Sequence, residues 1–136
     1  MKKVLIHLAS GFEEIEAITP IDVLRRAGCE VVTVSVTGTH EVIGAHGITV
    51  LADKLFTESD YDHADLIVLP GGQPGSDNLN RHEGLKKQIM NFNQQGKLLA
   101  AICAAPLVLG SAGVLRGKKA TCYPGVEPRL TGATCT

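Results

Sequence analysis

The chain of 136 residues has few aromatic side chains and almost no net charge. Aromatic residues make up 4% of it, and 13 basic residues stand against 14 acidic ones. No basic cluster extends beyond Arg25-Arg26 or Lys118-Lys119, so the sequence offers no footprint for nucleic acid or for an anionic membrane surface. We therefore expect small molecules or protein surfaces as partners, and neither nucleic acid nor membrane.

Long hydrophobic runs are also lacking. The apolar stretch after Lys3 resembles a leader, but it stops at His7 and acids follow from Glu13. It is too short for a signal peptide and far too short to cross a bilayer. The four cysteines have no regular spacing, which predicts free thiols in a cytoplasmic protein. They are Cys29, Cys103, Cys122 and Cys135.

Motifs for phosphates and metals are missing as well. No Gly-x-x-x-x-Gly-Lys-Ser/Thr loop occurs, and no Gly-x-Gly-x-x-Gly follows the first apolar run. The five histidines lie singly, and neither His-x-x-x-His nor Cys-x-x-Cys is found. We therefore expect no metal site.

Short apolar runs instead alternate with helical patterns. Strands are predicted at 3–8, 31–36, 65–69 and 98–102, helices at 14–27, 79–93 and 104–109, and a hairpin around 44–47. The run Leu66-Ile67-Val68-Leu69 does not alternate with polar residues, which is typical of strands buried on both faces of a parallel sheet. The chain therefore reads as a single α/β domain with a doubly wound sheet.

Cys103 lies where an apolar run gives way to a helical pattern. Such a cysteine is exposed at the sheet edge and faces the positive end of a helix, which favours the thiolate. Its small neighbours suit the tight turn of a nucleophile elbow, and Pro106 suits a first helical turn. A cysteine used as a small core residue explains the segment equally well.

Two further segments follow predicted strands and should reach the same sheet edge. Glu13, Glu14 and Glu16 open the first helix, where the helix dipole stabilises each acid by roughly 0.3–1 kcal/mol. Three acids are more than the N-terminus of a helix needs, and a protonated carboxyl beside a thiolate would donate a hydrogen bond to it. Gly71-Gly72 allows positive φ and a close approach of N–H groups, as an oxyanion site requires, although a plain turn has the same composition.

Taken together, these segments resemble the ThiJ/PfpI superfamily, in particular the branch of the parkinsonism-associated protein deglycase. The resemblance covers the whole chain and implies a flavodoxin-like fold, with a mostly parallel sheet, helices on both faces, and a homodimer. The motifs that carry it are Ala9-Ser10-Gly11-Phe12-Glu13-Glu14-Ile15-Glu16, Leu69-Pro70-Gly71-Gly72 and Ala100-Ala101-Ile102-Cys103-Ala104-Ala105-Pro106.

The resemblance also implies roles for individual residues. Cys103 would be the nucleophilic and oxidation-sensitive thiol, and Glu16 the protonated acid that hydrogen-bonds it, favours the thiolate and shuttles the proton. The N–H groups of Gly72 and Ala104 would be the oxyanion donors, with Gly71 in a supporting place. The implied activities need no cofactor: glyoxalase, removal of early methylglyoxal or glyoxal adducts from amino groups and thiols, and redox-linked chaperone behaviour. We expect a cysteine enzyme of reactive-carbonyl defence, with a non-catalytic redox sensor or chaperone as the alternative.

Some positions depart from the family pattern. Tyr123 stands where several relatives have a histidine, and because a phenol is a poor base at neutral pH we expect it to orient rather than relay protons. Ala104 stands where PfpI peptidases have a histidine, which disfavours peptidase activity. No histidine follows His82, as a glutamine amidotransferase-like domain would require. The family continues beyond Thr136 through further strands, a Gly-Pro-Gly loop and a helix, so we expect residues 1–136 to be an incomplete domain with an uncovered face or edge of the sheet.

Overall fold

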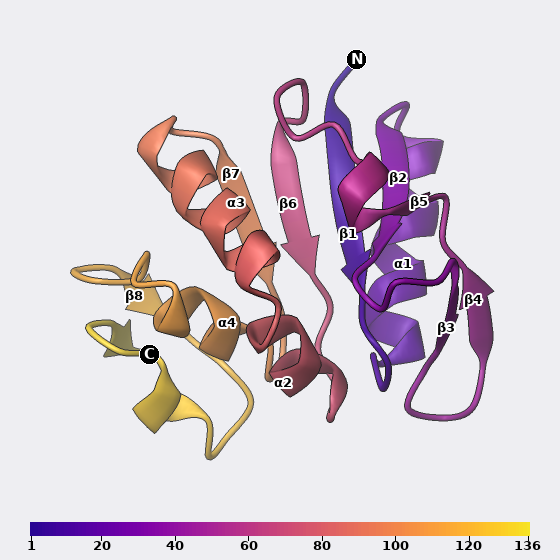
Figure 1. Cartoon of the computed structure of the whole chain (residues 1–136). Coiled ribbons are helices and arrows are strands. Elements are labelled where there is room, and N and C mark those ends of the chain that lie inside the picture. Colours follow the sequence, from indigo (N-terminus) through magenta and orange to yellow (C-terminus); the bar gives the residue numbers. More distant parts are fainter.

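A five-stranded parallel sheet forms the centre of the molecule (Figure 1), as the computed structural model of residues 1–136 shows. Its order is β5-β2-β1-β6-β7, with β1 at Lys3–Leu8, β2 at Glu30–Ser35, β5 at Lys54–Leu55, β6 at Leu66–Leu69 and β7 at Leu98–Ala101. In the central strand, Leu5 is aligned with Val32 on one side and Ile67 on the other. The predicted parallel, doubly wound sheet is therefore confirmed.

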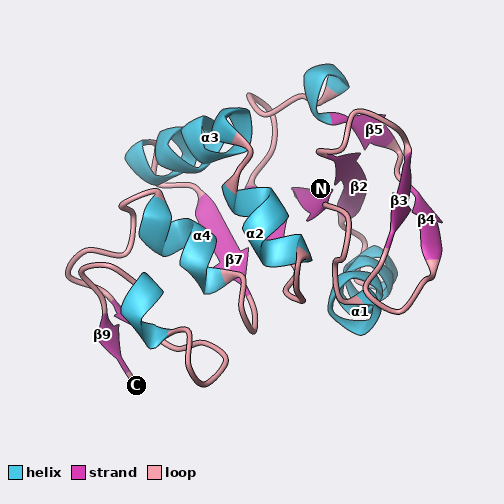
Figure 2. Ribbon diagram, turned by 60° about the horizontal axis from the view of Figure 1, so that its bottom comes forward, coloured by secondary structure: helices cyan, strands magenta, loops and turns pink.

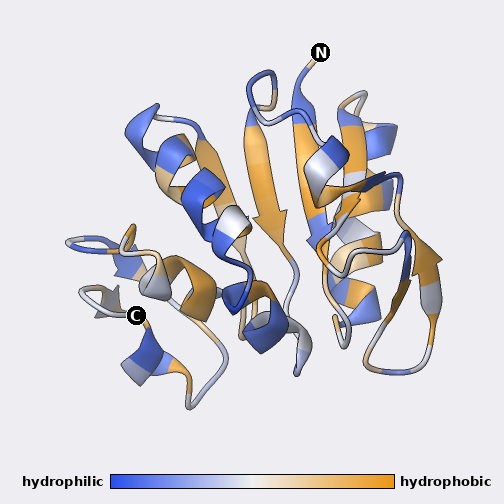
Figure 3. Ribbon diagram, viewed as in Figure 1, coloured by the Kyte–Doolittle hydropathy of each residue, from blue (hydrophilic) through white to orange (hydrophobic).

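Helices lie on both faces of this sheet (Figure 2). Helix α1 (Glu14–Arg26) packs on one face, where Ile21 joins Val4, Ile6, Val31 and Val68 in a small core cluster. Helices α2 (Gly75–Asn80), α3 (Glu83–Gln94) and α4 (Pro106–Ser111) bury the other face in a cluster of 19 residues. The strands between these layers are the most continuously apolar segments (Figure 3), because both of their faces are covered. None of the helices combines the length and the apolar composition needed to cross a membrane.

The remaining elements are short and lie at the margins. The predicted hairpin is confirmed as antiparallel β3 (Glu41–Ile43) and β4 (Thr49–Leu51). Two 3-10 turns, η1 (Phe56–Glu58) and η2 (Glu127–Arg129), and a parallel pair, β8 (Lys119–Ala120) with β9 (Thr134–Cys135), were not predicted. The predicted helix at 79–93 is wrong in one respect, because it is two helices. His82 is extended between them, with φ −85° and ψ 99°, and its ring accepts a hydrogen bond from the Leu85 N–H to cap α3.

One part of the sheet has no helix over it. On the α1 side of β6 and β7 lies an apolar groove of about 530 Å³, whose walls include Ile15, Val23, Val68, Ala100 and Ile102. Ile15 is 74% exposed and Ile102 is 52% exposed.

Candidate active site

Cys103 occupies a strained turn directly after β7. Its φ is 63°, and it is the one non-glycine residue with positive φ. For a residue with a Cβ this conformation costs roughly 1–2 kcal/mol, so the surroundings must hold it. They do so through the Tyr123 N–H, which donates to the Cys103 carbonyl at 2.8 Å, and the Ala105 N–H, which donates to the Ile102 carbonyl at 3.0 Å. Pro106 then begins α4, which gives the strand, strained turn and helix of a nucleophile elbow.

Glu16 reaches this turn from the first turn of α1. Its Oε1 accepts a hydrogen bond from the Gly71 N–H at 2.9 Å, and the same carboxyl is hydrogen-bonded to the Cys103 thiol. Position 71 leaves little room for a side chain, because a Cβ there would lie 2.8 Å from the Cys103 Cβ and 2.7 Å from the Ile102 carbonyl oxygen. The missing side chain therefore lets the loop after β6, the start of α1 and the cysteine turn meet.

The N–H groups of Gly72 and Ala104 both act on the Cys103 sulfur. Gly72 has φ 91°, and a Cβ there would come within 2.6 Å of the Glu13 nitrogen. Two backbone N–H donors directed at one sulfur favour its anionic form. The structure thus brings together all four residues predicted for catalysis and oxyanion binding.

Gly71 and Tyr123, the two residues predicted to support the site, contact it through different groups. Gly71 acts through Glu16, as the donor to its carboxyl oxygen. Tyr123 contacts Cys103 through its backbone N–H, while the residue itself is 60% exposed.

The pKa of the Cys103 thiol is shifted in the direction opposite to the one we expected. Burial raises the pKa of Cys103, and the negative charge of Glu16 and the hydrogen bond to it raise this pKa further, against the opposite effect of the Ala104 and Gly72 N–H groups. We expected Glu16 to favour the thiolate. An ionised carboxyl repels the thiolate and so adds to the effect of burial on the pKa of Cys103.

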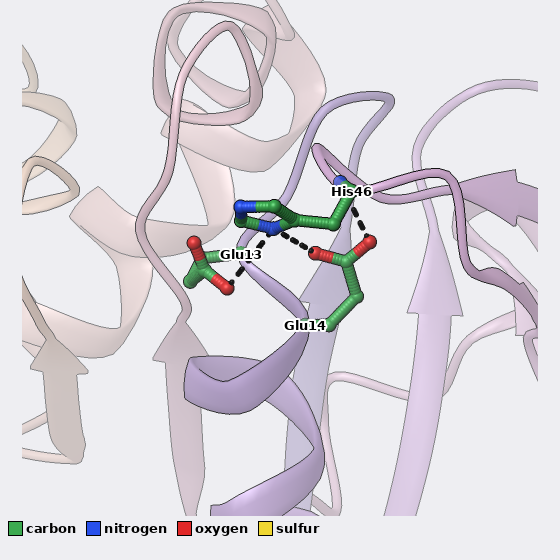
Figure 4. Close-up of side chains that lie close together, drawn as sticks. All are labelled: Glu13, Glu14 and His46. Atoms are coloured by element: carbon green, nitrogen blue, oxygen red, sulfur yellow. Dashed lines mark hydrogen bonds and ion pairs between the residues drawn. The ribbon is translucent and has the colours of Figure 1, made fainter.

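A second polar cluster was not predicted and lies where α1 begins (Figure 4). The Glu14 Oε2 accepts hydrogen bonds from the backbone N–H groups of His46 at 2.8 Å and Ile48 at 3.2 Å. Its Oε1 lies 3.0 Å from the His46 Nδ1, and the Glu13 Oε1 lies 3.5 Å from that same nitrogen. Since Glu14 and His46 are 32 residues apart, no local spacing could reveal the cluster.

Charge in this cluster is shared between the acids and the imidazole. Burial of Glu14 opposes its ionisation, yet hydrogen bonds from the His46 ring and from backbone N–H groups lower the pKa of this carboxyl to about 2. The hydrogen bond to Glu14 raises the pKa of His46, and the negative charges of Glu13 and Glu14 add to this effect.

Comparisons with known proteins identify relatives of this chain. A sequence model of the DJ-1/PfpI family matches residues 2–136. Protein DJ-1 homolog B of Arabidopsis thaliana is 48% identical over 130 residues, which are 95% of this chain and 30% of that protein. A deglycase of Pyrococcus abyssi is 37% identical over 131 residues, which are 96% of this chain and 78% of that protein. The solved structure of oxidized Toxoplasma gondii DJ-1 is 40% identical, with a TM-score of 0.90 over 98% of this chain and 76% of that one. The chain therefore spans less than a third of the plant relative's length.

Proposed function

Since the chain belongs to the DJ-1/PfpI family, we propose that it is a cofactor-independent enzyme of reactive-carbonyl defence, a glyoxalase or protein deglycase. The observation that carries the proposal is Cys103, held at positive φ against Glu16 and the N–H groups of Gly72 and Ala104. The deglycase of Pyrococcus abyssi, 37% identical to this chain, supports the same class of activity. Free thiols at all four cysteines suit a reducing compartment such as the cytoplasm.

Methylglyoxal illustrates the proposed chemistry. The Glu16 carboxylate accepts the thiol proton, and the Cys103 sulfur attacks the aldehyde carbon, which places the new oxyanion at the N–H groups of Gly72 and Ala104. The resulting hemithioacetal transfers a proton from its first carbon to its second, so the aldehyde carbon is oxidised and the ketone carbon reduced. Water then hydrolyses the lactoyl thioester to lactate and the free thiol. One water is consumed, and no external oxidant or reductant takes part.

The direct test is methylglyoxal turnover by three forms of the protein. Cys103→Ser should abolish lactate formation while it preserves the far-UV circular dichroism spectrum and the melting temperature. Cys29→Ser is the matched control, because Cys29 is also a half-buried free thiol but lies beside β2, with the small core cluster under α1. Lactate formation by Cys103→Ser at the rate of the control would refute the proposal.

A second candidate function is redox sensing or redox-linked chaperone activity without catalysis. It is favoured by the oxidized form in which the Toxoplasma gondii relative was solved. Here Cys103 would be oxidised to a sulfinic acid, with a protonated Glu16 as hydrogen-bond donor to it. Mass spectrometry after mild peroxide, beside the turnover assay, separates the two functions. Oxidation confined to Cys103 in a protein that turns over no methylglyoxal would favour the sensor.

We further propose that the chain forms a homodimer. Large apolar residues are exposed on two neighbouring parts of the surface. Ile15 and Val23 of α1 border the groove over β6 and β7, Ile48 and Leu51 lie in the β3–β4 hairpin, and each of the four is more than half exposed. Apolar exposure of this kind marks association surfaces. Light scattering should give twice the chain mass of 14.4 kDa. A monomer mass at micromolar concentration would contradict the dimer.

A further inference from the structure

The cluster of Glu13, Glu14 and His46 plays no part in the chemistry assigned to Cys103. The first two residues come from the start of α1, and His46 comes from the turn between β3 and β4 (Figure 4). Their ligand atoms all lie within 4.8 Å of one another. We propose that these three side chains form a binding site for a divalent first-row transition-metal ion of the zinc class.

The spacing of the ligand atoms fits such an ion. The His46 Nδ1 lies 3.0 Å from the Glu14 Oε1 and 3.5 Å from the Glu13 Oε1. A tetrahedral ion with bonds of about 2.0–2.2 Å places its ligand atoms about 3.3–3.5 Å apart. The two distances from the His46 Nδ1 therefore need shifts of only a few tenths of an ångström, and the ion takes the place of the proton between Nδ1 and the carboxylates.

The Glu14 carboxylate is already oriented for this role. Its side chain is 7% exposed, and its Oε2 is fixed by the His46 and Ile48 N–H groups, which leaves Oε1 directed at the His46 ring. Ligand carboxylates in metal sites are held in the same way by hydrogen bonds to the oxygen that does not bind. The turn is built around this side chain, because a Cβ at Gly44 would lie 2.8 Å from the Glu14 Cγ.

Ordinary histidine–carboxylate pairs elsewhere in the chain lack this arrangement. His63 is paired with Asp60 alone and His40 with Glu58 alone, whereas His46 faces two carboxylates. The positive end of α1 opposes a cation, but two carboxylates within bonding distance of the ion attract it more strongly.

The cluster is open to solvent on one side. The side chains of His46 and Glu13 are 66% and 24% exposed, so an ion can enter and keep a water as its fourth ligand. An imidazole among the ligands favours Zn²⁺ or Co²⁺ over Mg²⁺ or Ca²⁺, which prefer oxygen alone.

Titration of the full chain with Co²⁺, followed by visible absorption and by calorimetry, tests the site. We expect one Co²⁺ per chain, displaced by Zn²⁺ and not by Mg²⁺, with no thiolate-to-cobalt charge-transfer band. His46→Asn and Glu13→Gln should each weaken binding by at least about 10-fold, as is usual when a metal site loses a group that holds it. These two residues are chosen because both are accessible, and their variants should melt at the temperature of the unmodified protein.

His63→Asn is the matched control, since it removes an exposed histidine that has one carboxylate partner. Its Co²⁺ affinity should be unchanged. Absence of stoichiometric binding, a thiolate band, or equal affinities in His46→Asn and His63→Asn would each overturn the metal site. None of these results depends on methylglyoxal turnover, so the test is independent of the activity proposed for Cys103.

Discussion

Replacing Gly71 with alanine adds a single methyl group at the point where Glu16 meets Cys103. The φ of Gly71 lies outside the left-handed region, so alanine can adopt its backbone conformation without strain. The methyl carbon would nevertheless lie 2.8 Å from the Cys103 Cβ and would overlap the Glu16 carboxyl. Carbon atoms prefer separations of about 3.5–4.0 Å, so the groups must separate by about 0.7 Å or more.

This displacement should act on catalysis more than on folding. A misplacement of about 1 Å at a reacting centre costs about 100-fold in rate, so we expect kcat/KM for methylglyoxal to fall by about 10-fold to 100-fold. Overpacking at such a position destabilises by about 1–3 kcal/mol, which urea unfolding would measure. Every group named in the mechanism is still present in Gly71→Ala, so the lost rate reports geometry alone.

Gly96→Ala is the control for stability. Gly96 lies just before β7, at the end opposite Cys103, with φ 72° and no atom within 4 Å of the place that a methyl group would take. Its alanine variant should lose about 1–2 kcal/mol of stability through backbone strain and keep full activity. If Gly71→Ala turns over methylglyoxal as fast as Gly96→Ala does, the close approach of Glu16 to Cys103 is not required for the reaction.

Three further predictions concern single groups. Glu16→Gln should speed iodoacetamide alkylation of Cys103 at pH 7, because the carboxylate raises the pKa of this thiol. The same variant should slow methylglyoxal turnover by about 100-fold, because the base is lost. If both rates rise together or fall together, Glu16 does not have these two roles. Tyr123→Phe should leave kcat/KM within about 2-fold, since Tyr123 contacts Cys103 through its backbone, and a loss on the scale of general-base catalysis would show a role for the phenol. Burial lowers the pKa of His7 from 6.5 to about 4, so the unfolded chain takes up a proton on this imidazole at a higher pH than the folded chain does. The free energy of unfolding should therefore fall by up to about 3 kcal/mol as the pH drops from 6.5 to 4. Urea unfolding across that range, beside His7→Gln as the control without an ionisable group, would show no such difference if His7 were already charged.

Four of the five strands of the sheet and their parallel direction could be predicted, because burial on both faces leaves a plain trace in the sequence, whereas β5 was not predicted. The run Leu66-Ile67-Val68-Leu69 is β6, and the predicted range 3–8 is β1. The division between α2 and α3 could not be predicted, because it depends on the His82 ring as a cap for the Leu85 N–H. Strands of two residues, such as β8 and β9, carry no periodicity at all.

The candidate active site could likewise be predicted only in part. The order of the motifs placed Cys103, Glu16, Gly72 and Ala104 at one sheet edge, because parallel strands end together there. Sequence reasoning did not show that Gly71 donates to Glu16, nor that burial and the Glu16 charge would oppose the thiolate. His46 was missed because a turn between two short strands brings it to α1. Such contacts depend on three-dimensional closure rather than on local pattern.

The central claim is that Cys103 bonds covalently to the carbonyl substrate during turnover. Rapid acid quench of the protein with methylglyoxal, followed by peptide mapping, tests it most directly. We predict an adduct on the peptide that contains Cys103, formed before lactate appears and lost as the substrate is exhausted. Lactate formation with no adduct at Cys103, or with adducts equally distributed over Cys29 and Cys135, would contradict it.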